Sequence, residues 1–241
     1  MKAVCPKHGE YEEETIELFG QVIRSGCPIC EQEMDAEEAR VSQETTSKAQ
    51  QARLMECGIE PEYFNVVLEN YKAENDSEKK ALEASRDLES GKIRKLLLIG
   101  SNGTGKTMLA CCLAQSLGGV RITMFELGAR IRHGYNNGKS ELEILDGLLA
   151  SPFICIDEVG RSKGSDAEKN WLSYLIDKAH TRNIRLMIIS NRQTAKNLPA
   201  DKRGEAIECF FDNDVISRLK QNSRIVEVKG RDRRAAAYAS V

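Results

Sequence analysis

The sequence predicts an α/β protein, in which a parallel β-sheet flanked by helices follows a small cysteine-rich N-terminal domain. Three observations support this fold class. From Leu96 onward, short apolar runs alternate with helical stretches, a pattern typical of a parallel sheet with helices on both faces. A glycine-rich segment, residues 100–107, separates the first of these strands from a helix. Residues 1–34 instead consist of short segments dense in Cys, Gly and Pro.

The length and composition of the chain fit a folded protein without a membrane segment. Its 241 residues are 41% hydrophobic, enough for one or two domains with their own cores. No apolar run approaches the roughly 20 residues that a membrane helix needs, and the N-terminus lacks the apolar stretch of a signal peptide. We therefore expect a cytoplasmic protein with reduced thiols and no membrane partner. Its eight cysteines would then serve metal binding or burial rather than disulfides.

The charge of the chain is unevenly distributed, although the net charge is only −2. Residues 1–90 carry 10 basic and 21 acidic side chains, a net charge of −11. Residues 91–241 carry 25 basic and 16 acidic side chains, a net charge of +9. The basic part could contact nucleic acid, or the two parts could simply balance each other in a soluble protein.

Local periodicity and helix-ending residues predict the individual elements. Residues 35–57 are charged and contain few helix breakers, so they predict a helix. Residues 62–72 predict a connector with aromatic anchors, and the following helix over 77–90 can be capped by Asp76 or Ser77. The other expected elements are strands at 95–99, 120–125, 153–156 and 185–189, and helices at 108–115, 126–150 (broken near 134–138), 166–182 and 210–219.

Two pairs of metal-binding residue types lie near the N-terminus. Cys5 and His8 form a C-x2-H pair, and Cys27 and Cys30 form a C-x2-C pair after an interval of 18 residues. Together they complete a tetrahedral Cys₃His set with no position left for water, which favours structural Zn²⁺. A module this small has little core, so the metal would supply much of its folding energy. We expect it to hold a partner-binding surface, whereas burial accounts for the other five cysteines.

The glycine-rich segment reads Gly-Ser-Asn-Gly-Thr-Gly-Lys-Thr, a complete phosphate loop between a strand and a helix. The backbone N–H groups of such a loop surround phosphate oxygens, and the helix N-terminus adds partial positive charge. Lys106 would reach the β- and γ-phosphates, and the Thr107 hydroxyl would bind Mg²⁺. The sequence therefore predicts binding of ATP with Mg²⁺. The expected loop residues are Gly100, Ser101, Asn102, Gly103, Thr104, Gly105, Lys106 and Thr107.

A second apolar strand, 153–156, ends in the carboxylates Asp157 and Glu158, which is the Walker B pattern. Asp157 would hold Mg²⁺, directly or through water, and Glu158 would orient and deprotonate the attacking water. The paired carboxylates favour hydrolysis, so we expect an ATPase rather than a metabolite kinase.

Two further residues are expected to act on the phosphates. Asn191 follows strand 185–189, where its amide can hydrogen-bond the γ-phosphate or the attacking water (the role called sensor 1) or can simply end the strand. Arg218 can act as an arginine finger, which extends from one subunit to contact the phosphates bound by its neighbour. The alternative is a surface pair with Asp214, four positions earlier. Other arginines that could contact phosphate are Arg224, Arg231, Arg233 and Arg234.

The order and spacing of these motifs resemble those of AAA+ helicase loaders of the DnaC type and of their relatives, the IstB-type transposition helper ATPases. The shared segments are residues 96–107, 154–160, 188–192 and 214–219. The resemblance covers about residues 62–230. The N-terminal segment with the two metal-binding pairs is similar to the zinc-bearing N-termini of phage and prophage loaders. It implies an AAA+ P-loop NTPase with a reduced lid, since only 23 residues follow Arg218. Residues 231–241 would form a flexible tail, with Arg233 and Arg234 as candidates for a sensor 2 arginine.

The resemblance also implies partners. In that family the N-terminal domain, here residues 1–61, binds the hexameric DnaB-like replicative helicase. The ATPase domain, here 62–230, binds single-stranded DNA and self-assembles. The resemblance implies that Arg130 and Arg132 face DNA, on the additional helix characteristic of initiators and loaders.

The implied function is ATP-dependent loading of the replicative helicase onto single-stranded DNA, with Glu158 and a neighbour's Arg218 hydrolysing ATP to release the assembly. Two alternatives stay open. One is an IstB-like helper that works with a transposase on duplex DNA, although the two metal-binding pairs favour the loader. The other is a helicase-binding adaptor or inhibitor in which ATP is only a structural switch.

Overall fold

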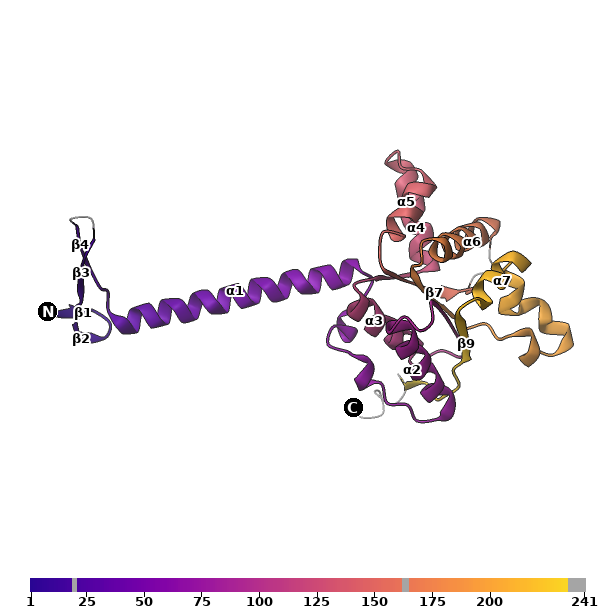
Figure 1. The fold of residues 1–241 in the computed structure, drawn as a ribbon, viewed down its shortest axis with the longest axis horizontal. Helices are drawn as coiled ribbons and strands as arrows, with labels where there is room; N and C mark the ends of the chain where they lie inside the picture. The colour runs from indigo at the N-terminus through magenta and orange to yellow at the C-terminus, as the bar shows by residue number, and fades with distance from the viewer. Residues whose placement is uncertain (19–20, 162–164, 234–241) are drawn as a thin grey trace. The chain divides into compact units, whose positions relative to one another are not determined.

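The structure, a computed structural model, describes residues 1–18, 21–161 and 165–233 (Figure 1). The chain divides into two compact units, Met1–Arg53 and Leu54–Val241, with the boundary inside the first helix. The predicted domain limits at residues 61 and 230 stay a prediction, and residues 234–241 of the predicted tail lie outside the described residues. Among the described helices, none combines the length and apolar character that a membrane span requires.

The described part of the N-terminal unit contains two antiparallel hairpins followed by a helix. The elements are β1 (Lys2–Cys5) paired with β2 (Gly9–Glu12), β3 (Thr15–Leu18) paired with β4 (Gln21–Arg24), and α1 (Pro28–Glu56). The hairpins were not predicted, because segments such as β2, Gly-Glu-Tyr-Glu, lack the apolar alternation of a strand. The helix begins at Pro28 rather than at residue 35, and this places Cys30 on its first turn.

The second unit is built on a parallel sheet, in which the described strands have the order β6-β7-β8-β5-β9. The strands are β5 (Lys95–Ile99), β6 (Val120–Thr123), β7 (Phe153–Val159), β8 (Arg185–Ser190) and β9 (Ser223–Glu227). The central strands β5, β7 and β8 are almost fully buried, as expected for strands covered on both faces. The edge strand β9 was not predicted, because its sequence, Ser-Arg-Ile-Val-Glu, is half polar.

Helices cover both faces of this sheet (Figure 1). They are α2 (Asp76–Glu89), α3 (Lys106–Leu117), α4 (Met124–Asn136), α5 (Glu141–Leu148), α6 (Asp166–Thr181) and α7 (Asn213–Lys220). Short 3₁₀ helices are η1 (Pro61–Tyr63), η2 (Leu68–Asn70), η3 (Ala195–Asn197), η4 (Ala200–Glu205) and η5 (Ile207–Phe210). One apolar core packs α2 and α3 against one face of the sheet. The other core packs the helices α4, α5, α6 and α7 against the opposite face. The α/β fold class is therefore confirmed.

Two local predictions change because of side-chain caps. Helix α2 is capped by Asn75, whose side chain accepts hydrogen bonds from the N–H groups of Ser77 and Glu78, and not by Asp76 or Ser77. Strand β6 ends at Thr123, two residues before the predicted end, because the Thr123 hydroxyl accepts from the Glu126 N–H and begins α4.

Candidate functional site

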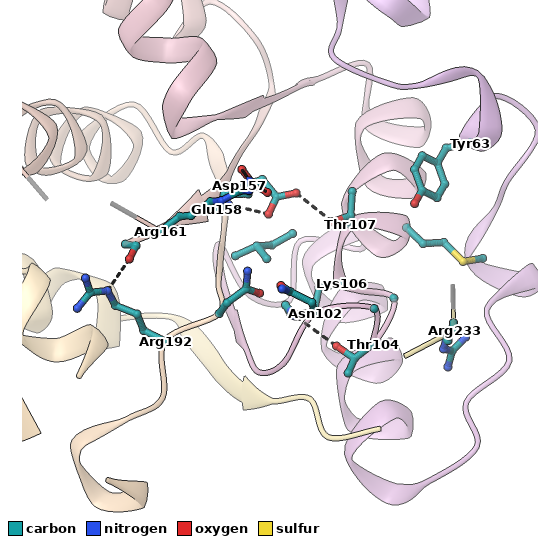
Figure 2. Close-up of a pocket in the computed structure, with 16 residues that line it drawn as sticks. Tyr63, Asn102, Thr104, Lys106, Thr107, Asp157, Glu158, Arg161, Arg192 and Arg233 are labelled. Carbon is teal, nitrogen blue, oxygen red and sulfur yellow. Dashed lines mark hydrogen bonds and ion pairs between the residues drawn. The ribbon is translucent and has the colours of Figure 1, made fainter. Parts of the chain in front are cut away.

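A cavity of about 720 Å³ lies where β5, β7 and β8 end, the edge at which open parallel sheets bind ligands (Figure 2). The phosphate loop, the end of β7 and the residues after β8 line it. The cavity brings together the predicted residues Asn102, Gly103, Thr104, Gly105, Lys106, Thr107, Asp157, Glu158 and Asn191. Gly100 and Ser101 form the base of the loop, where their carbonyls accept hydrogen bonds from the Lys106 ammonium at 3.0 and 2.6 Å.

The phosphate loop needs glycine at its turns. Gly103 and Gly105 have φ of 74° and 85°, in the left-handed region that glycine adopts without strain. A Cβ on Gly105 would also lie 2.8 Å from the Tyr71 ring, and one on Gly103 would meet Asp232. The Tyr71 hydroxyl donates to the Thr104 carbonyl at 3.1 Å, so residues outside the motif support the loop from behind.

The predicted magnesium ligands face each other across the cavity edge. The Thr107 hydroxyl donates to Oδ2 of Asp157 at 3.1 Å. Adjacent ligands of an octahedral Mg²⁺, each about 2.1 Å from the ion, lie about 3 Å apart. Oxygen donors are the ligands that Mg²⁺ prefers, so this pair fits the ion in both chemistry and spacing.

Glu158 sits on an irregular part of β7. The pairing of β7 with β8 shifts between Ile156 and Val159, and Glu158 has φ of 57°, which is uncommon for a residue with a side chain. Such strained positions are frequent at functional sites. The Glu158 carboxylate accepts from Nη1 of Arg161 through both oxygens, at 2.7 and 2.8 Å, and is about one-third exposed. The carboxylate is therefore held by Arg161, a residue that the sequence motif did not single out.

Arg121 is the main site residue that sequence reasoning missed. It lies on β6 and is buried, with Nε and Nη2 3.0 and 2.9 Å from Oδ2 of Asp157. Its Nη1 donates to Glu60 at 2.9 Å and to the Gly58 carbonyl at 3.0 Å. Burial opposes its charge, but the carboxylates of Asp157 and Glu60 hold the pKa of Arg121 above its ordinary value. A single arginine within the strand Val-Arg-Ile-Thr was the available signal.

The predicted arginine finger is not among the residues lining this cavity. Arg218 lies on α7 and pairs with Asp177 of α6, not with Asp214 as the alternative had it. Arg233 does line the cavity, with its guanidinium 4.5 Å from the centre of the Tyr71 ring and 2.8 Å from the buried Glu78. The other named arginines pair elsewhere: Arg224 with Glu83 and Asp87, and Arg231 with Glu74, while Arg234 lies outside the described residues.

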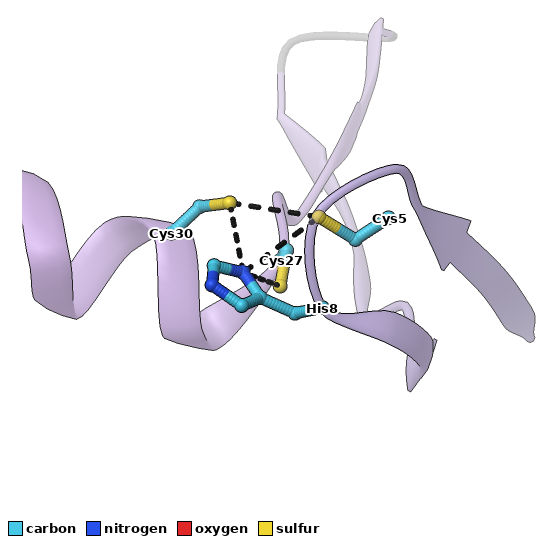
Figure 3. Close-up of side chains that lie close together, drawn as sticks. All are labelled: Cys5, His8, Cys27 and Cys30. Carbon is cyan, nitrogen blue, oxygen red and sulfur yellow. Dashed lines mark hydrogen bonds between the residues drawn. The ribbon is translucent and has the colours of Figure 1, made fainter.

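The four predicted metal ligands converge in the N-terminal unit (Figure 3). Nδ1 of His8 lies 3.8, 3.7 and 3.3 Å from the sulfurs of Cys5, Cys27 and Cys30, and the Cys5 and Cys30 sulfurs are 3.6 Å apart. Tetrahedral Zn²⁺ would place such atoms about 3.5–3.8 Å apart. Nε2 of His8 is 3.3 Å from Glu33, the kind of outer contact that orients a metal-binding histidine. The set therefore fits zinc.

The thiols of this cluster differ in acidity. Backbone hydrogen bonds from Lys7 and His8 lower the pKa of Cys5 to about 6, and the hydrogen bond with Cys5 raises the pKa of Cys30 to about 11. The lowered pKa of Cys5 favours the thiolate, the form that binds metal. The cysteines outside it are mostly buried, and burial raises the pKa of Cys111 to about 12. Cys209 is exposed, so burial was a wrong prediction for that residue.

A strand, phosphate loop and helix in the same parallel sheet as a Walker B strand define a P-loop nucleotide-binding protein. The sequence of residues 34–238 matches the family of IstB-like ATP binding proteins, and the chain belongs to that family.

Relatives and solved structures agree with this assignment. The chain is 27% identical over 149 residues to the replicative helicase loader DnaC of Escherichia coli K12, covering 58% of this chain and 61% of that protein. It is 26% identical over 199 residues to DnaC of Buchnera aphidicola from Baizongia pistaciae, covering 76% of this chain and 77% of the relative. A crystal structure of the DnaC helicase loader matches with a TM-score of 0.56 and 23% identity, covering 70% of this chain and all of that one. The crystal structure of DnaI matches with a TM-score of 0.53 and 19% identity, covering 73% of this chain and 94% of that one. The predicted resemblance to DnaC-type AAA+ proteins and the predicted fold are therefore confirmed.

Proposed function

We propose that this protein is an ATP-dependent loader, which places a DnaB-like hexameric replicative helicase onto single-stranded DNA in the cytoplasm. The observation that carries the proposal is a cavity lined by the phosphate loop and the Walker B carboxylates, in a chain that aligns along 76% of its length with a replicative helicase loader. ATP would hold the assembly together, and hydrolysis would release it.

The residues of the cavity account for the chemistry. Lys106 would exchange the carbonyls of Gly100 and Ser101 for the β- and γ-phosphates, because a phosphate oxygen is a stronger acceptor for an ammonium. Thr107 and Asp157 would hold Mg²⁺, which supplies neutralisation of phosphate charge when bound. Glu158 would leave Arg161 to take a proton from water, which Asn191 would help to orient. Together these residues support hydrolysis rather than binding alone.

The position of Arg218 supports hydrolysis between subunits. The Arg218 side chain on α7 is 41% exposed, and its guanidinium could enter the cavity of a neighbouring copy once it leaves Asp177. Self-association would then complete the site, since a guanidinium in the transition state is worth about 10³–10⁵ in rate.

Mixing two inactive variants tests this arrangement. We expect Lys106→Ala to lose ATP binding and Arg218→Ala to keep binding but lose turnover about 10³-fold. An equal mixture should recover about a quarter of the wild-type rate, the fraction of random neighbours that pair an intact cavity with an intact arginine. The measurement is steady-state ATP hydrolysis at a concentration that supports assembly.

The matched control for this mixture is Arg224→Ala, which removes another partly exposed arginine of the same unit, paired with Glu83 and Asp87. Without a second variant present, Arg224→Ala should keep most of the wild-type ATP hydrolysis rate. If the mixture stays inactive although both variants assemble, Arg218 does not act in a neighbour's cavity.

The helix α4 supports contact with DNA. Arg130 and Arg132 are exposed on it, and the ring of Phe125 is also exposed, at 76%. Exposed arginines near an aromatic ring suit a single strand, because guanidinium groups bind phosphates and rings stack on bases. The N-terminal unit with its metal cluster would bind the helicase.

The family match favours a second candidate, an IstB-like helper that works with a transposase on duplex DNA. Incubating the protein with a hexameric helicase or with a transposase, in ATP and in ADP, separates the two by size-exclusion chromatography. Co-elution with the helicase in ATP supports the loader, and co-elution with the transposase alone rejects it. Helicase binding with no turnover on single-stranded DNA would instead indicate an adaptor or inhibitor.

A further inference from the structure

The connector that follows α1, residues 57–60, is fastened to the edge of the sheet beside the magnesium ligands. The backbone N–H of Arg121 donates to the Cys57 carbonyl at 2.8 Å, and Ile59 is fully buried. Gly58 has φ of 75°, and a Cβ there would lie 1.9 Å from the Arg121 carbonyl oxygen. Only glycine allows this approach.

One guanidinium joins the connector to Asp157. Two nitrogens of Arg121 donate to Oδ2 of Asp157, and the third donates to both Glu60 and the Gly58 carbonyl. The same Oδ2 faces the Thr107 hydroxyl, while Oδ1 accepts from the Glu158 N–H at 2.7 Å. Among the described residues, the side chain that holds the Asp157 carboxylate, apart from that of Thr107, is therefore Arg121.

We propose that Arg121 is a positioning residue, which fixes the Asp157 carboxylate for Mg²⁺ and makes that position depend on the docked connector. The inference rests on the proposed ATP-dependent function of the cavity. Because the connector directly follows α1, it gives the N-terminal unit a route along the chain to the magnesium site.

Positioning and charge make opposite predictions for Mg²⁺ affinity. If Arg121 acted mainly as a positive charge, removing that charge would tighten Mg²⁺ binding, and a substitution that keeps the charge would leave Mg²⁺ binding unchanged. If Arg121 orients the carboxylate, weakening its contacts with Asp157 lets the carboxylate move and weakens Mg²⁺ binding. Loss of such outer contacts to metal ligands commonly lowers metal affinity by about 10–100-fold. Two contacts from the guanidinium to one carboxylate oxygen, inside a buried site, favour positioning.

The test measures binding of a fluorescent ATP analogue as Mg²⁺ is titrated. Arg121→Lys keeps the charge but replaces the planar guanidinium with a single ammonium. We therefore expect half-maximal binding of the analogue to need about tenfold more Mg²⁺. Glu60→Gln weakens only the contact between Arg121 and the connector. We expect it to raise the Mg²⁺ concentration for half-maximal binding by about threefold. The control Glu62→Gln changes an exposed carboxylate two residues beyond the connector, in η1, and should match the wild type.

A second readout follows from linkage, because two coupled sites affect each other equally. Mg²⁺ and ATP should slow amide hydrogen exchange in a peptide covering residues 57–60, and this effect should be lost in Arg121→Lys. If Arg121 were purely structural, Arg121→Lys would change the exchange rate of this peptide by the same amount with and without Mg²⁺.

The outcomes separate the inference from the function on which it rests. Tighter or unchanged Mg²⁺ dependence in both Arg121→Lys and Glu60→Gln would overturn the positioning role, and faster exchange with Mg²⁺ would do the same. If the wild-type protein fails to bind the analogue at any Mg²⁺ concentration, the proposed function itself fails. Glu60→Gln keeps the test decisive should Arg121→Lys fold poorly, since Glu60 is half exposed.

Discussion

Replacing Glu158 with glutamine is expected to leave ATP binding within a few-fold of the wild type and to reduce hydrolysis by about 10²–10⁴, the usual contribution of a general base. The amide keeps the size of the side chain and can still contact Arg161, but it cannot accept the proton of the attacking water. Binding should persist because the contacts expected to phosphate come from the loop and Lys106 instead. Single-turnover hydrolysis and a nucleotide titration measure the two effects separately.

A matched control for this variant is Glu83→Gln, which alters an exposed carboxylate on α2 that also pairs with an arginine, Arg224. Its turnover should equal that of the wild type. Turnover of Glu158→Gln within about tenfold of the wild type would mean that another group activates the water.

Removing the metal from the N-terminal cluster is expected to unfold the hairpins while leaving the ATP site intact. Among residues 1–15 and 25–53, whose side chains the structure describes, the buried ones are Cys5 and Cys27, and α1 contains no buried residue. These side chains give the hairpins little apolar core, so zinc binding, worth about 10–16 kcal/mol in small zinc domains, would supply much of their stability. Cys30→Ser should lose its zinc, and its hairpins should be cleaved rapidly by protease.

The control for this prediction is Cys209→Ser, because Cys209 is an exposed thiol of the other unit. It should keep one zinc per chain and its resistance to protease, and both variants should bind ATP like the wild type. A Cys30→Ser protein that retained zinc, or hairpins that stayed protected after chelation, would contradict the structural role of the metal.

Features that depend on contiguous sequence were predictable, and features that depend on distant contacts were not. The phosphate loop, Asp157 and the strands β5, β7 and β8 are local patterns. Strand β5 has the predicted bounds, whereas β7 and β8 begin where predicted but continue to Val159 and Ser190. The two metal-binding pairs were also readable, because their spacing within each pair is fixed by the turns. Arg121 was missed since its partners Glu60 and Asp157 lie far from it in the chain and meet only in the folded sheet.

Two further differences have a similar physical origin. The edge strand β9 is recognised by pairing with β5, since its own side chains show little apolar alternation. The unusual backbone of Glu158 comes from the shift in pairing between β7 and β8, which no pattern within either strand reveals. In both cases the tertiary partner, rather than local propensity, determines the conformation.

The central claim is that ATP bound in this cavity lets the protein place a helicase ring around single-stranded DNA. A closed circular strand gives the most direct measurement, because a closed hexameric ring cannot thread onto a strand without ends. The number of helicase hexamers retained on circles is counted after gel filtration, with wild-type protein or Lys106→Ala. The account predicts retention with wild-type protein and ATP, and little with Lys106→Ala or with no added protein. Equal retention in all three samples, or less retention with the wild-type protein, would contradict it.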